Sequence, residues 1–331
     1  MHTIPVVDLS ALERPGPSEA QAQARQLDLA CRRAGVFEVV GHGISRELQT
    51  DLFAYTREFF RLPDVAKAVV SQPAPDQVRG WSALGSEGVA YSLDEESPAD
   101  LKEKLDMGPP SPRGDAHYRD PERAGPHLAP NLWPAEIPAL QDVWHRYFEH
   151  MERIGNQLMM LTALASGLPA DWFIDRFDKS VSMLRALHYP EQPNAALTGQ
   201  LRAGVHSDYG AFTIIMGEER PGGLEVLDRS GAWMPVATAP GRLIVLLGDL
   251  LAEWTADVWP STLHRVVNPL RGRAADSSRL AFAFYQEPNY DLQIDILPPY
   301  RVDGHTPLPP FTAGEHLREK YLRQTTFGRD S

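Results

Sequence analysis

The chain of 331 residues has one cysteine, no long apolar run and no excess of positive charge. A single cysteine, Cys31, excludes an internal disulfide and is typical of the reducing cytoplasm, where we expect the protein to reside. No apolar run approaches the roughly 20 residues that span a bilayer. The first residues also lack the basic and then apolar pattern of a secretory signal, so we expect no membrane partner.

The balance of charge limits the partners further. A net charge of -12 argues against nucleic acid, because such a partner requires neutralisation of its phosphates. Hydrophobic residues make up 43% and charged residues 23% of the chain, as in an ordinary globular protein. We expect a monomer.

The first half of the chain carries mostly helical patterns. A short strand over residues 4–9 precedes a helix over 19–34 that ends at Gly35, and a strand over 36–40 precedes a helix over 48–62. A longer helix is predicted by apolar residues that recur every three or four positions, namely Ile137, Leu140, Trp144, Tyr147, Met151, Ile154, Leu158, Leu161 and Leu164.

The second half has short β-rich runs separated by glycine, proline and aspartate turns. These runs cover residues 212–216, 224–227, 243–247 and 279–285. Helices followed by strands favour a β-sandwich or jelly roll with helices packed outside. We expect a single domain over 1–331, made of a helical and strand module with substrate loops over 1–180, a β-rich core over 181–300 and a closing segment over 301–331.

Two histidines and an aspartate stand out within the strand-like half. In His206-Ser207-Asp208, alternation along an extended segment places the first and third side chains on one face, so both can reach one metal. His264 begins another strand-like run and can supply the third ligand. Three protein ligands leave coordination positions open, which is typical of non-haem Fe(II) oxygenases. Because imidazole binds metal in its neutral form, iron affinity is expected to weaken as pH falls through the imidazole range.

A longer series of motifs accompanies these residues: His206-Ser207-Asp208-Tyr209-Gly210, Gly222-Gly223-Leu224, Gly248-Asp249, His264-Arg265-Val266 and Arg279-Leu280-Ala281. The series resembles the isopenicillin N synthase-like branch of the Fe(II)- and 2-oxoglutarate-dependent dioxygenases. The resemblance extends to the segments over 4–9 and 35–43 and is weakest over 71–134. It implies a mainly β fold with a double-stranded β-helix (jelly-roll) core, flanked by N-terminal and mid-chain helices.

The resemblance also implies roles for individual residues. The metal ligands, which are at the same time the catalytic residues, are His206, Asp208 and His264. The cofactor Fe(II) is chelated in addition by 2-oxoglutarate, and one position remains for O2. Arg279 pairs with the distal carboxylate of 2-oxoglutarate, a task suited to a planar guanidinium group that stays charged. Tyr189 donates to the same carboxylate, and Arg185 approaches either the iron-side end of the cosubstrate or the substrate.

The implied reaction oxidises a small organic substrate, such as an amino acid or a natural-product intermediate, with release of succinate and CO2. Hydroxylation is the commonest outcome in the family, and desaturation and cyclisation also occur. Two alternatives stay open. One is an isopenicillin N synthase-type iron oxidase that uses no 2-oxoglutarate, which an assay of succinate release distinguishes. The other is a non-catalytic metal- or ligand-binding protein on the same scaffold, against which the intact ligand set argues.

Three features depart from the family pattern, one of which is Leu187 at a position where many relatives have asparagine. Ala281 stands where the family usually has serine, so one hydroxyl donor to the distal carboxylate is missing. A neutral hydrogen bond of this kind contributes roughly 0.5–1.5 kcal/mol. The segment between His264 and Arg279 is also longer than usual and offers Arg273 as a competing anchor, although Arg279 opens a strand and is therefore better aimed.

The substrate is expected to be selected by loops outside the core. These are the proline- and glycine-rich stretch over 71–134, with possible strands at 80–81 and 104–108, and a closing helix over 314–321. Phe282 is expected either to line the pocket or to pack in the core. Glu103 and Lys104 are expected either to be pocket charges or to be solvated.

Overall fold

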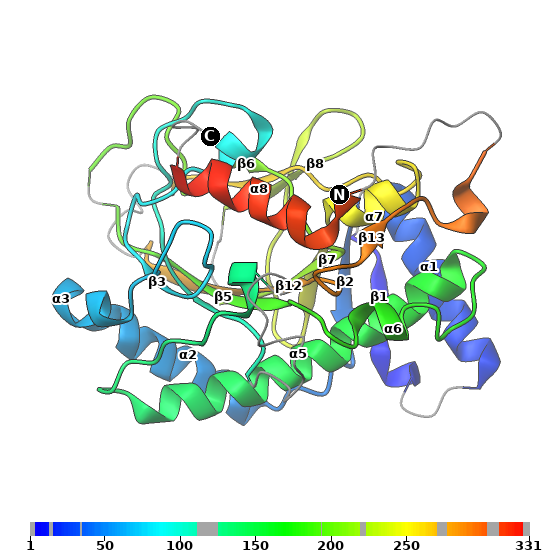
Figure 1. Ribbon diagram of the computed structural model, residues 1–331, viewed down its shortest axis with the longest axis horizontal. Coiled ribbons are helices and arrows are strands. Elements are labelled where there is room, and N and C mark those ends of the chain that lie inside the picture. Colours follow the sequence, from blue (N-terminus) through cyan, green and yellow to red (C-terminus); the bar gives the residue numbers. More distant parts are fainter. Residues whose placement is uncertain are drawn as a thin grey trace.

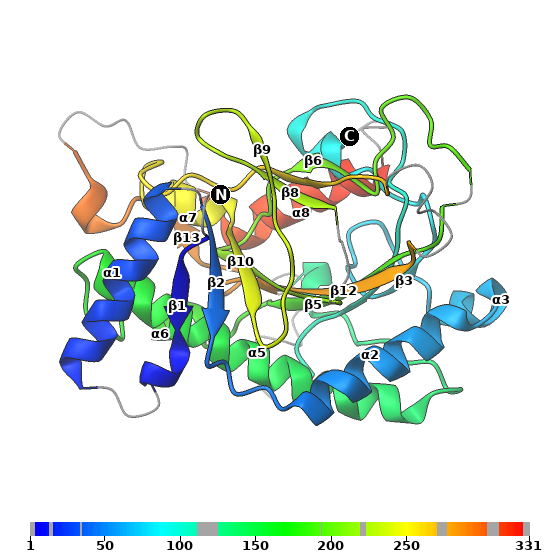
Figure 2. The same ribbon diagram turned by 180° about the vertical axis from the view of Figure 1, so that it is seen from behind.

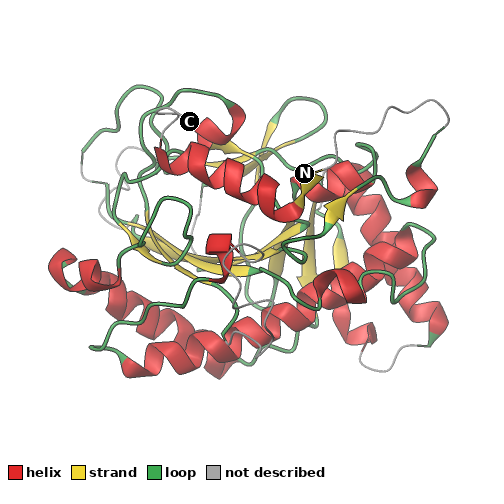
Figure 3. Ribbon diagram, in the orientation of Figure 1, coloured by secondary structure: helices red, strands yellow, loops and turns green. Residues whose placement is uncertain are grey.

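Two β-sheets that face each other form the centre of the computed structural model (Figure 1). The larger sheet has eight strands and the smaller has four. Helices lie beneath the larger sheet, and one helix, α8 (Ala313–Thr326), lies on its other side (Figure 3). This arrangement confirms the predicted jelly-roll core with helices packed outside. The structure describes residues 4–12, 16–33, 35–110, 125–192, 194–218, 223–269, 277–302 and 311–326.

The larger sheet is built from both halves of the chain. Its strands in spatial order are β1 (Val6–Asp8), β2 (Val36–Val40), β10 (Leu243–Leu247), β7 (Phe212–Gly217), β12 (Arg279–Gln286), β5 (Met183–Tyr189), β4 (Glu103–Met107) and β3 (Gly80–Ser82). β1 and β2 are parallel, whereas the other neighbours are antiparallel. Figure 2 shows β1 and β2 beside β10, with α1 (Pro17–Arg33) next to them. The strands predicted within the first 110 residues therefore form both edges of the sheet.

The smaller sheet is short and antiparallel throughout. Its order is β6 (Ala203–His206), β11 (His264–Val266), β8 (Leu224–Leu227) and β9 (Trp233–Pro235). Along β8 the alternating residues Leu224 and Val226 are buried, as expected for a strand with one face toward the core. β11 pairs with β6 on one side and with β8 on the other, which brings two distant segments of sequence into register.

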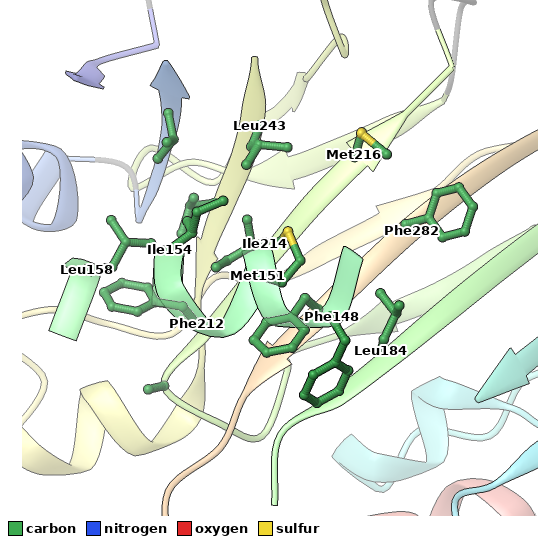
Figure 4. Packing of buried hydrophobic residues seen from close by; sticks show 14 of the residues in the cluster. Phe148, Met151, Ile154, Leu158, Leu184, Phe212, Ile214, Met216, Leu243 and Phe282 are labelled. Atoms are coloured by element: carbon green, nitrogen blue, oxygen red, sulfur yellow. The ribbon is translucent and has the colours of Figure 1, made fainter. Parts of the chain in front are cut away.

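The long helix α5 (Pro138–Ala165) supports the larger sheet from outside. Its apolar stripe is buried, and Phe148, Met151 and Ile154 lie against side chains of β5, β7 and β12 (Figure 4). Proline at the first helical position needs no hydrogen-bond partner, so it suits the start. At the end, Gly167 adopts a φ of 74°, and the Leu168 amide donates to the carbonyl of Ala163 at 2.8 Å. This is a Schellman motif, and it stops the helix just after Leu164, the last apolar residue of the predicted stripe.

Two N-terminal helices pack beside these layers. α1 is followed by Gly35, whose φ of 65° is accessible to glycine and whose missing Cβ would lie 2.5 Å from Oγ1 of Thr262. α2 (Arg46–Arg61) begins after Ser45, whose hydroxyl accepts from the Leu48 amide at 3.1 Å. Both helices confirm the sequence prediction to within about two residues, the usual uncertainty at helix ends.

The remaining elements are short. They are the helices α3 (Asp64–Lys67), α6 (Ile174–Phe177) and α7 (Asp249–Trp254), the 3-10 helices η1 (Leu9–Leu12), η2 (Ala68–Val70), η3 (Val89–Leu93), η5 (Gly125–Leu128) and η7 (Pro298–Tyr300), and the strands β13 (Gln293–Ile294) and β14 (Phe311–Thr312). The predicted closing helix is confirmed as part of α8. Among the described residues, no helix combines the length and the hydropathy that crossing a bilayer requires.

Candidate active site

The structure brings the three predicted metal ligands together. His206 ends β6 and His264 begins β11, and the two residues are direct partners in the antiparallel register. Their ring centroids are 4.1 Å apart. Asp208 follows His206 by two residues and is buried. One ligand atom from each residue lies within 4.8 Å of the other two, so the set can hold a single metal ion.

Hydrogen bonds orient both imidazoles toward the carboxylate. Nδ1 of His206 lies 2.8 Å from the carbonyl oxygen of Gly204, and Nδ1 of His264 lies 2.9 Å from that of Thr262. Each Nδ1–H therefore donates to a carbonyl, which leaves Nε2 with a free lone pair. The Nε2 atoms lie 3.7 and 3.6 Å from the carboxylate oxygens of Asp208.

Burial adjusts the triad for metal binding. It lowers the pKa of His206 well below its usual value, and the neighbouring His264 and Lys102 lower this pKa further. His206 therefore remains neutral, as a ligand must be, over a wide range of pH. Oδ2 of Asp208 is buried, and no hydrogen-bond partner for it lies in the part of the chain that the structure describes. A cation at the centre of the triad would satisfy this oxygen, so the residues present fit a divalent metal.

A cavity between the two sheets extends away from the triad. Thr213 and Tyr285, which are register partners, lie in its wall near the metal ligands, whereas Arg279 and Tyr189 are register partners further along β12 and β5. The wall between is apolar and is formed by Leu187, Ala203, Ile215, Leu224, Val236, Val266, Ala281 and Ala283. The cavity can therefore hold a short ligand whose middle is apolar and whose far end is an anion.

The far end of the cavity has an excess of buried positive charge. The Arg279 guanidinium lies 4.6 Å and the Arg202 guanidinium 5.7 Å from the centre of the Tyr189 ring. Burial lowers the pKa of Arg279, while burial and then Arg279 itself lower the pKa of Arg202 to about 10. Nε of Arg279 is buried and has no hydrogen-bond partner among the described residues. An anion bound here would relieve this repulsion, and a carboxylate matches the fork of the guanidinium.

Arg185 lies in the cavity wall nearer the metal ligands. Its Nε lies 2.7 Å from Oδ1 of Asp106 and its Nη2 lies 3.1 Å from Oδ2, so the guanidinium makes a two-pronged ion pair. Its remaining Nη1 is 4.0 Å from Glu87. Arg185 thus borders the cavity, with its Nε and Nη2 engaged by Asp106 and its Nη1 free of a close hydrogen-bond partner among the described residues.

A buried charged network beside the cavity was not apparent from the sequence. Nζ of Lys102, which lines the cavity, lies 3.0 Å from Glu87 and also pairs with Asp100. Asp100 in turn accepts from the amides of Gly204, at 2.9 Å, and Val89, at 3.1 Å. The network therefore holds β6, and with it His206, against η3. No local pattern marks these residues, because charged residues in a loop usually face solvent.

The C-terminal helix α8 lies over the loop that carries Asp208. The Tyr209 hydroxyl donates to Oε1 of Gln324 at 2.7 Å. His316 lies 3.7 Å from Asp249, whose carboxylate also accepts from Ser207. Side chains on both sides of the metal-ligand aspartate are therefore tied, directly or through Asp249, to the closing helix.

Several candidates lie elsewhere. Phe282 is on the face of β12 opposite the cavity, where it packs against Phe53 and Trp144 with ring centroids 5.0 and 6.1 Å apart. The expectation that Phe282 lines the pocket is therefore wrong, and the expectation that it packs in the core is confirmed. Both alternatives for Glu103 and Lys104 are wrong, because each is buried in ion pairs and neither lines the cavity.

The competing anchor Arg273 lies outside the described residues. Of the two arginines, the structure places Arg279 in the wall of the cavity and does not describe Arg273.

Comparison with known proteins agrees with this geometry. A family model described as the non-haem dioxygenase N-terminal region in morphine synthesis matches residues 4–136, and the 2OG-Fe(II) oxygenase superfamily model matches residues 180–288. The chain is 33% identical over 294 residues to proline hydroxylase buaE of Petromyces alliaceus, with 86% of each chain covered. It is 28% identical over 327 residues to validamycin A dioxygenase of Streptomyces hygroscopicus subsp. limoneus. This match covers 98% of this chain and 87% of the relative.

A solved structure extends the likeness to three dimensions. A full-length protein of Neurospora crassa in complex with alpha-KG, which is 2-oxoglutarate, has a TM-score of 0.81 and 26% identity over 96% of this chain and 95% of that one. Family models, relatives and structure all point to one chemistry. The chain therefore belongs to the Fe(II)- and 2-oxoglutarate-dependent dioxygenases of the isopenicillin N synthase-like type, enzymes that use O2 to oxidise small organic substrates.

Proposed function

We propose that the triad of His206, Asp208 and His264 binds the catalytic Fe(II), and that Arg279 and Tyr189 bind the distal carboxylate of 2-oxoglutarate. The observation that carries this assignment is the placement of both sets in one cavity. The convergent Nε2 and carboxylate atoms are at one end, and the buried guanidinium is at the other, with apolar side chains between them. A five-carbon dicarboxylate with a keto group next to one carboxylate has this distribution of polarity.

Each residue has a defined task in the reaction. The backbone carbonyls fix the imidazole rings, so Nε2 of each is presented without rearrangement. Arg279 orients the cosubstrate so that its keto acid end faces the ligands. The apolar wall excludes water from the space between. Bound Fe(II) supplies the activation of O2 that oxidises 2-oxoglutarate to succinate and CO2 and oxidises the substrate.

The substrate is proposed to be an amino acid or a natural-product intermediate, most commonly hydroxylated. Support comes from the relatives, which include a proline hydroxylase and a dioxygenase of validamycin A. On the side of the metal ligands, the wall carries Arg185, Tyr285 and Thr213, which offer polar contacts to such a molecule. We further propose that the protein is a cytoplasmic monomer, in keeping with its single buried cysteine, and light scattering after size exclusion tests the monomer.

Binding and turnover test the assignment together. Calorimetry measures Mn(II), as a stand-in for Fe(II), and then 2-oxoglutarate. His264→Ala is expected to abolish Mn(II) binding, whereas His150→Ala, at a partly buried histidine of α5 outside the triad, retains it. Arg279→Gln is expected to weaken 2-oxoglutarate binding by about tenfold to a hundredfold, because it removes a charged hydrogen-bond partner.

Turnover separates the rival functions. With Fe(II), O2 and a panel of amino acids, the wild type is expected to release succinate in proportion to oxidised product. Substrate oxidation without consumption of 2-oxoglutarate would instead identify an oxidase of the isopenicillin N synthase type. Tight metal binding with no turnover of any kind would identify a binding protein.

A further inference from the structure

The end of the cavity that holds Arg279 has a methyl group where a hydroxyl would be useful. Ala281 is two residues from Arg279 on β12, so the two side chains are on the same face, and both line the cavity. Alanine offers no hydrogen-bond donor. A carboxylate has about four lone-pair sites, and a guanidinium and one phenol do not fill all of them.

Besides the Tyr189 hydroxyl, the hydroxyl of Thr238 lies near Ala281. Gly217 on β7 is the direct register partner of Ala281, so a side chain at either position would project toward the same part of the cavity. A Cβ on Gly217 would lie 2.8 Å from Cγ2 and 3.2 Å from Oγ1 of Thr238. The Thr238 side chain therefore occupies the space above Gly217, and it lines the same cavity as Arg279 and Tyr189.

Thr238 is held in this position by the chain around it. It lies in the connection between β9 and β10, and its hydroxyl donates to the carbonyl oxygen of Glu218 at 2.7 Å. A hydroxyl rotates about its C–O bond, so the proton can be redirected to a new acceptor. A carboxylate is the better acceptor, because hydrogen bonds to an ionised group are roughly twice as strong as neutral ones.

We propose that Thr238 donates a hydrogen bond to the distal carboxylate of 2-oxoglutarate and so supplies, from a different strand connection, the hydroxyl that Ala281 lacks. The proposal rests on the proposed function, in which Arg279 binds that carboxylate. Glycine at position 217 is part of the arrangement, since any larger residue would displace Thr238 from the cavity wall.

The first test measures 2-oxoglutarate binding to the Mn(II)-loaded protein by calorimetry. Thr238→Val has nearly the same shape and no hydroxyl, and it is expected to raise the Kd by about threefold to tenfold, the size of one hydrogen bond. Thr238→Ser keeps the hydroxyl and is expected to stay within about twofold of the wild type. An unchanged Kd in Thr238→Val overturns the proposal.

A second ligand separates this role from a general structural one. Oxalate chelates the metal but has no distal carboxylate, so its affinity is expected to be the same in Thr238→Val and in the wild type. Equal weakening of both ligands overturns the proposal, because it shows damage to the metal site rather than loss of one hydrogen bond. Thermal unfolding of each variant confirms that the protein compared is folded.

A rescue experiment tests the location of the missing hydroxyl. Ala281→Ser is introduced into the Thr238→Val background, where it is expected to restore most of the lost 2-oxoglutarate affinity. Absence of any recovery overturns the idea that the two positions serve the same carboxylate. Arg279→Gln serves as the separate control of the proposed function. If Arg279→Gln leaves the Kd unchanged, the anchor itself is wrong, whereas a large effect there together with none in Thr238→Val refutes the role of Thr238 alone.

Discussion

Replacing Glu287 with glutamine is expected to make the protein more stable, and increasingly so as pH rises. Glu287 follows β12 and is 2% exposed. Its carboxyl atoms lie 2.5 Å from the point where Gly210 would carry a Cβ, and its Oε2 has no hydrogen-bond partner among the described residues. Burial, and then repulsion from Asp208 and Asp249, raise its pKa from 4.5 to about 8.

The sign and size of the effect follow from this shift. The folded-state pKa of Glu287 lies above the unfolded value, so its contribution to stability is complete below pH 4.5 and is lost as pH rises through 8. One pKa unit corresponds to about 1.4 kcal/mol, so the free energy of unfolding falls by roughly 3 to 4 kcal/mol between pH 5 and pH 8 on account of this group. Glutamine does not titrate and removes that loss.

Urea unfolding of the chelator-treated protein measures the difference. The advantage of Glu287→Gln over the wild type is expected to be about 1 kcal/mol at pH 5 and to grow by roughly 3 kcal/mol at pH 8. Titrating groups that do not interact with Glu287 act on both proteins and cancel in the comparison. Mn(II) offsets the charge of Asp208, so the pH-dependent difference should shrink when the metal is bound. A difference between the two proteins that is the same at every pH would refute the reasoning.

Three further substitutions test other parts of the argument. Arg202→Met is expected to raise the Kd for 2-oxoglutarate by about tenfold or less in calorimetry, because it removes a nearby positive charge but no direct anchor. Asp106→Asn is expected to destabilise the fold by about 3–5 kcal/mol in urea unfolding, since it removes the closest counter-charge of the buried Arg185. Phe282→Ala is expected to cost about 3–5 kcal/mol of stability through a cavity beneath α5, while Mn(II) affinity is unchanged. Loss of metal binding in this last variant would contradict its placement outside the site.

The metal site could be predicted from the sequence more completely than the cavity around it. His206 and Asp208 are two residues apart on an extended segment, so local alternation alone predicts that they share a face. That His264 is their partner also depends on the pairing of β11 with β6, which only the motif series suggested in advance. Both predictions agree with the structure, because a metal triad requires few residues and tolerates little variation in their position.

The buried ion pairs of β4 were harder to foresee. Lys104 and Glu103 lie in a strand whose five residues are all buried, whereas the sequence suggested that these two residues are either pocket charges or solvated. Their burial depends on counter-charges such as Glu87 and Lys67, which come from other elements. Such pairings join positions distant in sequence, so no local window reveals them.

The strand order of the larger sheet has a consequence for synthesis of the chain. β2, near the amino terminus, pairs with β10, and β4 pairs with β5, which in turn needs β12. The sheet therefore cannot close until the ribosome has released residues up to 286, at the end of β12. Such long-range pairing slows folding and leaves early strands with unpaired edges in the meantime. We expect the nascent chain to need protection by chaperones, and expression at low temperature to raise the yield of folded protein.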